Sequence, residues 1–333
     1  MAYVSVHIVT YNSAATIATC LKALLDQTFT DFDIRIIDNA SADDTVHRIN
    51  QMGIDVICNP VNVGYSAAHN QAIDGTNSAY VLTLNPDARL APTYIESLTH
   101  VLDSNPLVGS ASGCLLRVGN LDEDPTIIDS TGLLMRPNRH AGLRYEGLPV
   151  SERPMQIDPI FGPDGAAAFY RRAMLDDIRL FGEVFDTDFF LQKEDIDLCW
   201  RAQLRGWTSL YVPYAVARHV RTFRPGRRQG VSAQLRFYGI RNRYLLVMKN
   251  DVLTHFLHDL AAIAVYDMLI LGYVALKEQE SWSAFLSALS MFRKMMKKRQ
   301  VIQSRRRVQL DQLRRWFQPE AASCRLKTSP ESV

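Results

Sequence analysis

Cysteine is scarce in this chain, and the cysteines present are scattered. Five occur in 333 residues, an odd number without any close pair: Cys20, Cys58, Cys114, Cys199 and Cys324. This pattern argues against a disulfide framework and a zinc site, and it is typical of a reducing compartment. No charged and apolar leader precedes the first strand pattern at Val4, so we expect no signal peptide.

Glycine-rich phosphate-binding motifs are also missing. The first predicted strand runs into Thr10-Tyr11-Asn12-Ser13 without the G-x-G-x-x-G fingerprint, which excludes a dinucleotide-binding dehydrogenase domain. The chain has no G-x-x-x-x-G-K-[ST] loop either. A diphosphate bound at this position would therefore need a metal ion or basic side chains to neutralise it.

Charge is nearly balanced overall, at +2, but its distribution is uneven. From Arg293 onward there are 12 lysines and arginines against 3 acids, which leaves 25 against 32 in the preceding residues. A basic tail on an acidic body predicts an anionic partner, either nucleic acid or the headgroups of a membrane. Because no recognised nucleic-acid-binding module accompanies the charge, we expect no nucleic-acid partner.

The first third of the chain alternates strand patterns with helix patterns. Apolar runs predict strands over 4–9, 34–37, 54–58 and 80–84, and the stretches between them keep helical spacing. Asn12 or Ser13 can cap the first of these helices. Short connections between alternating elements predict an α/β fold with a mainly parallel sheet wound with helices.

Polar and acidic residues follow three successive predicted strands, and the sharpest of these ends is Leu84-Asn85-Pro86-Asp87. Asn-Pro stops the strand and leaves a carboxylate beside the carboxyl edge of the sheet, where ligands bind in α/β folds. Each such end taken alone is typical of a turn or cap. Their recurrence along one edge favours a binding site, in which Asp38 can accept hydrogen bonds from a base or ribose.

Two acidic stretches lie further along the chain. Asp164-Gly165 enters a run of small residues, which suits close approach to a sugar as well as it suits a tight turn. Glu194, Asp195 and Asp197 crowd the first turn of a helix predicted to end at Gly206. Helix capping explains one or two of these acids, and the third favours a carboxylate that deprotonates an acceptor hydroxyl.

Taken in order, these motifs resemble the signatures of family 2 glycosyltransferases. They are Val9-Thr10-Tyr11-Asn12, Ile37-Asp38-Asn39-Ala40-Ser41-Ala42-Asp43, Asn62-Val63-Gly64-Tyr65 with Ala67-Ala68-His69-Asn70, Leu84-Asn85-Pro86-Asp87, and Glu194-Asp195 with Asp197-Leu198 and Arg201. The resemblance covers residues 3–245 and implies a GT-A fold and an inverting enzyme that uses a nucleoside-diphosphate sugar. In place of the first acid of the D-x-D motif stands Asn85, a weaker ligand for a hard cation.

The resemblance also implies roles for individual residues. Asp195 becomes the general base and Glu194 a supporting acid, while Asp87 and His219 become ligands of Mg²⁺ or Mn²⁺. Arg221, Arg224, Arg227 and Arg228 lie in a loop that can close over the donor phosphates or remain solvated. The residues expected to bind the nucleotide sugar are Thr10, Tyr11, Asn12, Asp38, Asn39, Asn62, Gly64, Asn70, Asn85, Asp87, Asp164 and Gly165.

The C-terminal third is predicted to be helical. Residues 260–276 are apolar except for Asp267 and fall short of the roughly 20 residues of a membrane span, so we expect a buried or interfacial helix. An apolar stripe over 282–296 is flanked by basic side chains, from Arg293 to Arg299. Such a helix suits anionic lipid, and packing against the catalytic domain or a partner subunit fits equally.

We therefore predict four segments: a nucleotide-sugar-binding half (1–110), an acceptor-binding and catalytic half (111–245), a helical, basic extension (246–317) and a disordered tail (318–333). The predicted function is transfer of a sugar to a glycan or lipid-linked acceptor at the cytoplasmic face of the cell membrane. Resemblance to the bacterial rhamnosyltransferase branch suggests rhamnose from deoxythymidine-diphosphate rhamnose. The alternatives are a sugar- or nucleotide-binding partner without catalysis and a sugar-nucleotide pyrophosphorylase, and the oligomeric state stays open.

Overall fold

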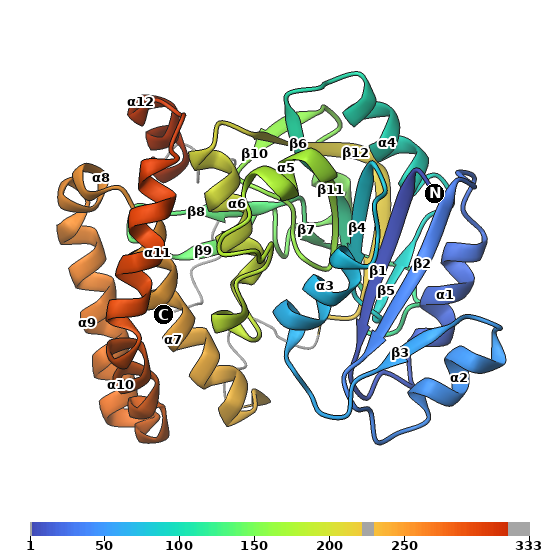
Figure 1. The fold of residues 1–333 in the computed structure, drawn as a ribbon, viewed down its shortest axis with the longest axis horizontal. Helices are drawn as coiled ribbons and strands as arrows, with labels where there is room; N and C mark the ends of the chain where they lie inside the picture. The colour runs from blue at the N-terminus through green and yellow to red at the C-terminus, as the bar shows by residue number, and fades with distance from the viewer. Residues whose placement is uncertain (1, 222–229, 319–333) are drawn as a thin grey trace.

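The computed structural model describes residues 2–221 and 230–318, which form a sheet covered by helices, with a helical layer at the C-terminal end (Figure 1). The strands are β1 (Val4–Thr10), β2 (Phe32–Asp38), β3 (Val56–Cys58), β4 (Tyr80–Leu84), β5 (Ala88–Leu90), β6 (Val108–Arg117), β7 (Ile127–Ser130), β8 (Leu133–Met135), β9 (Ala141–Leu143), β10 (Asp158–Ile160), β11 (Ala167–Arg171) and β12 (Thr208–His219). The helices are α1 (Ile17–Leu25), α2 (Thr45–Gln51), α3 (Tyr65–Asp74), α4 (Tyr94–Asp103), α5 (Arg172–Asp177), α6 (Glu194–Leu204), α7 (Ala233–Asn250), α8 (Leu253–His258), α9 (Leu260–Lys277), α10 (Trp282–Ser290), α11 (Phe292–Ser304) and α12 (Leu310–Arg314). Short 3-10 turns are η1 (Val150–Glu152), η2 (Thr187–Phe189), η4 (Gln279–Ser281) and η5 (Arg315–Phe317).

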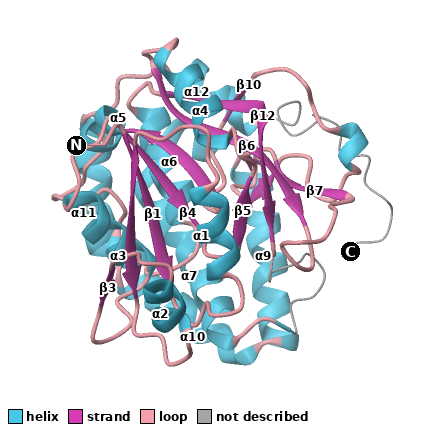
Figure 2. Ribbon diagram, turned by 90° about the vertical axis from the view of Figure 1, so that its right-hand side faces the viewer, coloured by secondary structure: helices cyan, strands magenta, loops and turns pink. Residues whose placement is uncertain are grey.

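The main sheet is parallel over its N-terminal half. Its order is β10-β12-β6-β11-β4-β1-β2-β3, with β5 paired to β12 and β7 paired to β6. β4, β1, β2 and β3 run parallel, and Figure 2 shows β1 and β4 side by side. β11 lies between β4 and β6 and is antiparallel to both. The α/β architecture predicted from the alternating patterns is confirmed, and β8 with β9 forms a separate two-stranded sheet.

Helices cover both faces of the sheet because their apolar residues recur at helical spacing. Ile17, Leu21 and Leu24 of α1 are fully buried and share one core cluster with α2, α4 and the strands. A second cluster joins α3, α5 and α6 to α7 and α11 of the C-terminal region. The C-terminal helices are therefore packed into the core of the domain.

The start of α1 differs from the prediction that Asn12 or Ser13 caps it. The helix begins at Ile17 after Thr16, and no side chain caps it. Asn12 instead has a φ of +52°, and its Oδ1 accepts a hydrogen bond from the backbone N–H of Ala42 at 2.8 Å. The Asn12 side chain thus makes a tertiary contact with the loop after β2 and does not cap the helix.

The apolar helix predicted over 260–276 forms as α9, but it is not buried. In the described part of the chain, α9 is the one helix that is long and apolar enough to cross a membrane, judged by length and composition only. Of its residues, 11% are buried. Its buried residues are Ile263 and Val274. Of the two predicted placements, the buried one is wrong, because the helix meets the domain along a single narrow face, and the interfacial one stays a prediction.

The basic residues of α11 serve the packing of the domain. Lys298 is buried, and its Nζ donates to Asp186 Oδ1 at 2.5 Å and to Asp188 Oδ2 at 2.6 Å. The fully buried Lys249 of α7 pairs with Asp186 and, at 2.9 Å, with Asp197 of α6. These residues form an ion cluster that ties α7 and α11 to the segment in front of α6, and the boundary predicted at residue 245 falls inside α7.

We expect Lys298→Ala to lower the free energy of unfolding by about 3 kcal/mol, because it leaves buried acids with one counter-ion fewer. Lys297→Ala is the matched control: Lys297 is exposed on the same helix, and its removal should change stability by less than about 0.5 kcal/mol. Urea denaturation of both variants measures the difference. Equal stabilities would contradict the structural role of the ion cluster.

Candidate active site

The polar residues predicted at the strand ends lie side by side. The β1–β2 register pairs Thr10 with Asp38, and the β1–β4 register pairs Ile8 with Leu84, the residue before Asn85. β4, β1 and β2 are direct neighbours, so their carboxyl ends form one edge of the sheet. This edge is one wall of a cavity of about 1080 Å³.

The cavity brings together residues predicted from distant parts of the sequence. Those that line it are Tyr11, Asn12, Asn39, Asn62, Gly64, Asn85, Asp87, Asp164, Gly165, Glu194 and Asp195. Asp87 on the sheet edge and Asp195 at the start of α6 therefore face the same space. Thr10, Asp38, Asn70 and His219 are not among the lining residues.

Thr10 and Asp38 are bonded to each other behind the cavity wall. Thr10 Oγ1 donates to Asp38 Oδ1 at 2.6 Å, and Ser41 donates to Asp38 through its hydroxyl at 2.6 Å and its backbone N–H at 2.8 Å. Both residues are buried. In this arrangement the Asp38 carboxylate holds the loop after β2, and Tyr11, Asn12 and Asn39 present themselves to the cavity.

Asn70 has a different place from the one predicted. It is buried in α3, and its Nδ2 donates to the carbonyl of Phe185 at 2.7 Å. Its Oδ1 accepts from the backbone N–H groups of Phe185 at 2.9 Å and Val184 at 3.2 Å. The side chain thus fixes the segment leading to η2, and no part of it lines the cavity.

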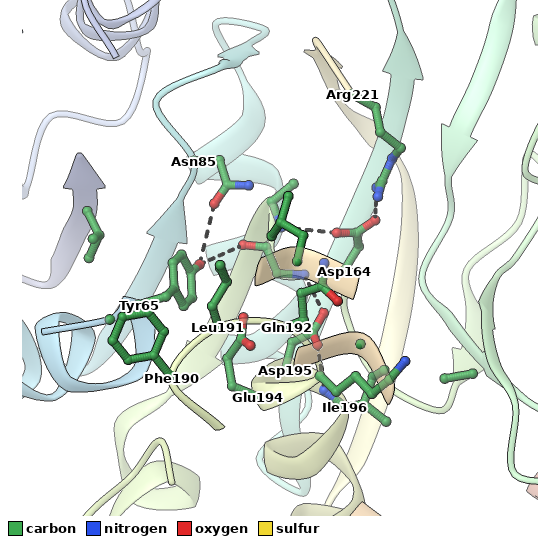
Figure 3. Close-up of a pocket in the computed structure, with 18 of the residues that line it drawn as sticks. Tyr65, Asn85, Asp164, Phe190, Leu191, Gln192, Glu194, Asp195, Ile196 and Arg221 are labelled. Carbon is green, nitrogen blue, oxygen red and sulfur yellow. Dashed lines mark hydrogen bonds and ion pairs between the residues drawn. The ribbon is translucent and has the colours of Figure 1, made fainter. Parts of the chain in front are cut away.

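A close contact joins the loop before α3 to the loop before α6. Gly64 has a φ of +88°, and a Cβ at this position would lie 2.5 Å from the ring of Phe190. Tyr65, the next residue, donates its hydroxyl to the Gly165 carbonyl at 3.2 Å and to Asn85 Oδ1 at 3.4 Å (Figure 3). Only glycine allows this approach, in which the loop before α3 packs against the loop before α6.

Asp195 is held by two backbone groups and stands beside a second acid. Its Oδ2 accepts from the N–H of Gly165 at 3.2 Å, and its Oδ1 from the N–H of Ile196 at 2.7 Å (Figure 3). A Cβ on Gly165 would lie 3.3 Å from the Asp195 side chain. Asp164, one residue earlier, accepts from Arg221 at 2.7 Å, so its charge is paired.

The acid pair at the start of α6 titrates above the ordinary range of carboxyl groups. Burial and the charge of Asp164 raise the pKa of Asp195 to about 6. Burial and the neighbouring Asp195 raise the pKa of Glu194 to about 8. Glu194 Oε2 is buried and accepts no hydrogen bond from the described residues. Near neutral pH Glu194 therefore keeps its proton, and Asp195 is available as a base.

Asp87 lies beside His219, whose other ring nitrogen contacts a second acid, Asp129. His219 Nε2 lies 3.4 Å from Asp87 Oδ1, and His219 Nδ1 lies 2.8 Å from Asp129 Oδ2. Asp129 is fully buried and also accepts from Arg221 at 2.7 Å and Arg117 at 3.0 Å. Burial alone would lower the pKa of His219, but the hydrogen bond to Asp129 and the nearby charge of Asp87 outweigh it and raise this pKa to about 9.

The residues around Asp87 fit a divalent cation in part. Asp87 Oδ1 is buried and accepts no hydrogen bond from the described residues, and a carboxylate with an imidazole suits Mn²⁺ or Mg²⁺. The described residues contain no cluster of three or more His, Cys, Asp or Glu side chains able to hold a metal. A cation at Asp87 would therefore take further ligands from the donor diphosphate.

The loop that delivers the acid pair is shaped by α7. Phe190, Gln192 and Lys193 all have positive φ angles, and Asn242 Nδ2 contacts the carbonyls of this loop. Its distances are 2.9 Å to Phe189, 2.8 Å to Leu191 and 2.8 Å to Gln192. The side chain of one α7 residue thus bonds to the backbone immediately before the predicted general base.

Sequence reasoning did not identify Asp129 or Asn242 as parts of the site. Asp129 lies in a region without a recognisable motif, although an acid within an apolar strand signals a buried charge that needs partners. No local feature of the sequence around Asn242 indicates its contact with the loop before α6. Of the predicted arginine loop, Arg221 pairs with Asp129 and Asp164, whereas Arg224, Arg227 and Arg228 lie outside the described residues.

Solved glycosyltransferases share this architecture. S. aureus TarS matches with a TM-score of 0.56 at 16% identity, over 88% of this chain and 49% of that chain. The mannosyltransferase PcManGT from Pyrobaculum calidifontis, solved in complex with GDP-Man and Mn²⁺, matches with a TM-score of 0.53 at 16% identity, over 90% of this chain and 85% of that chain. The fold is therefore the GT-A fold of glycosyltransferases, as predicted.

The family follows from the sequence. The profile of glycosyl transferase family 2 matches residues 5–179, and the chain belongs to this family. The N-acetylglucosaminyl-diphospho-decaprenol L-rhamnosyltransferase of Mycobacterium tuberculosis is 29% identical over 250 residues, covering 66% of this chain and 76% of the relative. The Escherichia coli protein WfaP, a UDP-Glc:alpha-D-GlcNAc-diphosphoundecaprenol beta-1,3-glucosyltransferase, is 26% identical over 158 residues, covering 40% of this chain and 63% of the relative.

The raised pKa of Glu194 predicts a pH-dependent stability. Because the folded protein holds this proton more tightly than the unfolded chain, the free energy of unfolding falls as pH rises from about 4.5 toward 8. Glu194→Gln removes this loss, so the variant should gain on the order of 3 kcal/mol over the wild type between pH 5 and pH 9.

Denaturation curves at pH 5, 7 and 9 measure this gain. Glu152→Gln is the control, since Glu152 is exposed and its replacement should leave the pH dependence of the wild type unchanged. Parallel pH–stability curves for Glu194→Gln and the wild type would contradict a buried, protonated Glu194.

Proposed function

We propose that this protein is an inverting glycosyltransferase that moves a sugar from a nucleoside diphosphate to the hydroxyl of a lipid-diphosphate-linked saccharide. The observation that carries the proposal is the shared cavity, which is lined both by Asp87 at the sheet edge and by Asp195 at the start of α6. Direct displacement at an anomeric carbon requires one group beside the leaving diphosphate and another beside the attacking hydroxyl, and we assign these roles to Asp87 and Asp195. Membership of family 2 supports the reaction class.

Asp195 is proposed as the general base. As the acceptor oxygen bonds to the anomeric carbon, the bond from this carbon to the diphosphate breaks, and the hydroxyl proton passes to Asp195. The carboxylate is held in place by the N–H groups of Gly165 and Ile196, and a pKa of about 6 keeps it ionised at neutral pH. Glu194, which carries a proton at this pH, is proposed to donate a hydrogen bond to the acceptor.

The donor is proposed to bind along the strand ends, with its diphosphate at Asp87. Asp87 and His219, the latter after its Nε2 has lost its proton, would hold a divalent cation there, with the Asn85 amide nearby, and the cation would neutralise the departing diphosphate. The clamp from Asp129 fixes the ring of His219 with Nε2 toward Asp87. The rhamnosyltransferase name of a relative supports rhamnose as the donated sugar. We propose deoxythymidine diphosphate as its carrier.

The acceptor and the location are proposed on the same grounds. The named substrates of two curated relatives are sugars linked through a diphosphate to a polyprenol, which supports an acceptor of this chemistry. A polyprenyl-linked acceptor resides in a membrane, so we propose a peripheral location on its cytoplasmic face. The exposed apolar residues of α9 suit such a location.

Asp195→Asn should abolish sugar transfer, with a fall in turnover of at least about 1000-fold, and leave nucleoside-diphosphate affinity within about twofold of the wild type. The asparagine preserves the size of the side chain and removes its ability to take a proton. Turnover is followed by release of nucleoside diphosphate in the presence of acceptor. Asp55→Asn, at an exposed position, serves as the control, and transfer at the wild-type rate by Asp195→Asn would refute the base assignment.

Asp87→Ala should remove the effect of Mn²⁺ on nucleotide binding. In the wild type we expect deoxythymidine diphosphate to bind about tenfold more tightly with Mn²⁺ than with a chelator, and in the variant equally in both conditions. Calorimetric titration measures both affinities, and Asp33→Ala, at an exposed position of β2, should behave as the wild type. A full Mn²⁺ effect in Asp87→Ala would exclude the proposed ligand.

A further inference from the structure

The cavity continues past the acid pair to a wall that the proposed reaction does not use. α7 and α9 build this wall, and Figure 1 shows α9 at the edge of the molecule farthest from α1 and β2. The α9 residues that line the cavity are Tyr266, Leu269, Ile270 and Tyr273. Their spacing of three and four residues places them on one face of the helix, and all four are aromatic or aliphatic.

This apolar wall is continuous with the outer surface of α9. Leu269 and Tyr273 line the cavity and are nevertheless 67% and 41% exposed. Beyond them, Met268 and Leu276 are 61% and 79% exposed. The only charged side chains of α9 are Asp267, which pairs with Arg243 at 2.9 Å, and Lys277 in its last turn. An apolar path therefore leads from the cavity to the outside of the protein.

Cationic side chains adjoin both the acid pair and this apolar wall: Lys193 directly precedes Glu194, and Arg243 Cζ lies 4.6 Å from the centre of the Tyr266 ring. Lys193 and Arg243 line the cavity, and Arg136 donates to His140 Nδ1 at 3.0 Å. The ring of His140 packs against Tyr266 of α9, with 5.4 Å between centroids. Burial and the charges of Lys193, Arg136 and Arg243 lower the pKa of His140 to about 3, so this ring stays neutral among positive neighbours.

The order of these features matches the order of groups in a polyprenyl diphosphate sugar. Such a molecule has a sugar hydroxyl, then a diphosphate, then a hydrocarbon chain. Along the cavity the corresponding features are the Asp195 carboxylate, the cationic side chains, and the apolar face that opens to the exterior. Cations suit the diphosphate, and burial of hydrocarbon against leucine and tyrosine stabilises the chain.

We propose that the α9 side of the cavity is the subsite for the lipid arm of the acceptor, an inference that rests on the proposed function. Lys193 contacts the diphosphate, the Asp267-paired Arg243 forms the adjoining wall, and Tyr266, Leu269 and Tyr273 contact the first isoprenoid units. The rest of the chain leaves along the exposed face of α9 into the hydrocarbon of the membrane. The acceptor thus enters from the side, opposite the nucleotide edge.

The test compares two acceptors that differ only in their lipid: N-acetylglucosaminyl diphosphate attached to a long polyprenyl chain, and the same sugar diphosphate attached to a methyl group. Both are assayed in detergent micelles with the variant L269Q/Y273Q. We expect KM for the polyprenyl acceptor to rise about tenfold, the loss expected for two apolar contacts, while KM for the methyl acceptor and the affinity for nucleoside diphosphate change less than twofold.

Leu107→Gln is the matched control, because Leu107 is 79% exposed and does not line the cavity. It should leave both KM values unchanged. An equal rise of KM for both acceptors, or no rise for either, would overturn the lipid subsite. A dimeric wild type that L269Q/Y273Q converts to monomers in sedimentation would also overturn it, because a second copy of the chain would then cover α9.

Failure of the proposed function gives a different result. In that case the wild type transfers no sugar to either acceptor, and the subsite is tested by binding alone. Polyprenyl diphosphate without a sugar should then bind the wild type about tenfold more tightly than L269Q/Y273Q in a micelle titration, and inorganic diphosphate should bind both equally. Equal affinity of the two proteins for polyprenyl diphosphate would overturn the inference independently of turnover.

Discussion

The candidate site depends on the hydrogen bonds that Asn242 donates to the carbonyls of Phe189, Leu191 and Gln192. The residues from Phe190 to Lys193 include three with positive φ, a conformation that costs about 1 kcal/mol for each L-residue. The loop keeps this shape because α7 supplies hydrogen bonds to the loop carbonyls. If the loop were extended, these hydrogen bonds would be lost. As a result, Glu194 and Asp195 enter α6 directed into the cavity.

A second constraint is the arrangement of buried charge on either side of the cavity. On the sheet edge, Asp129 gathers His219, Arg221 and Arg117, and Arg221 in turn neutralises Asp164. The ion cluster of Asp186, Lys249 and Lys298 joins the C-terminal helices α7 and α11 to the segment in front of α6. Acids that form ion pairs bind protons weakly. Glu194 is buried and Asp195 partly buried, with few cations nearby, and their pKa values are therefore raised.

Much of the fold was predictable from the sequence because the signals are local. The period of apolar residues identified β1, β4, α1 and α6, and Asn-Pro marked the end of β4. The strand-end residues could be placed together because parallel strands align their carboxyl ends. What could not be predicted depends on contacts between distant segments: Asn12 turns to Ala42, Asn70 bonds to Phe185, and α9 remains exposed although its composition suits a core.

The reach of α7 and α11 into the catalytic segment has a consequence for how the protein is made. The carboxyl ends of β1, β2 and β4 lie within the first 90 residues, so they can form early as the chain leaves the ribosome, whereas His219 of the same edge follows much later. The loop before α6 lacks its hydrogen-bond partner until Asn242 has been synthesised, and the ion cluster lacks Lys298 until later still. The strand ends proposed to bind the nucleotide are thus made well before the acids at the start of α6 are held in position.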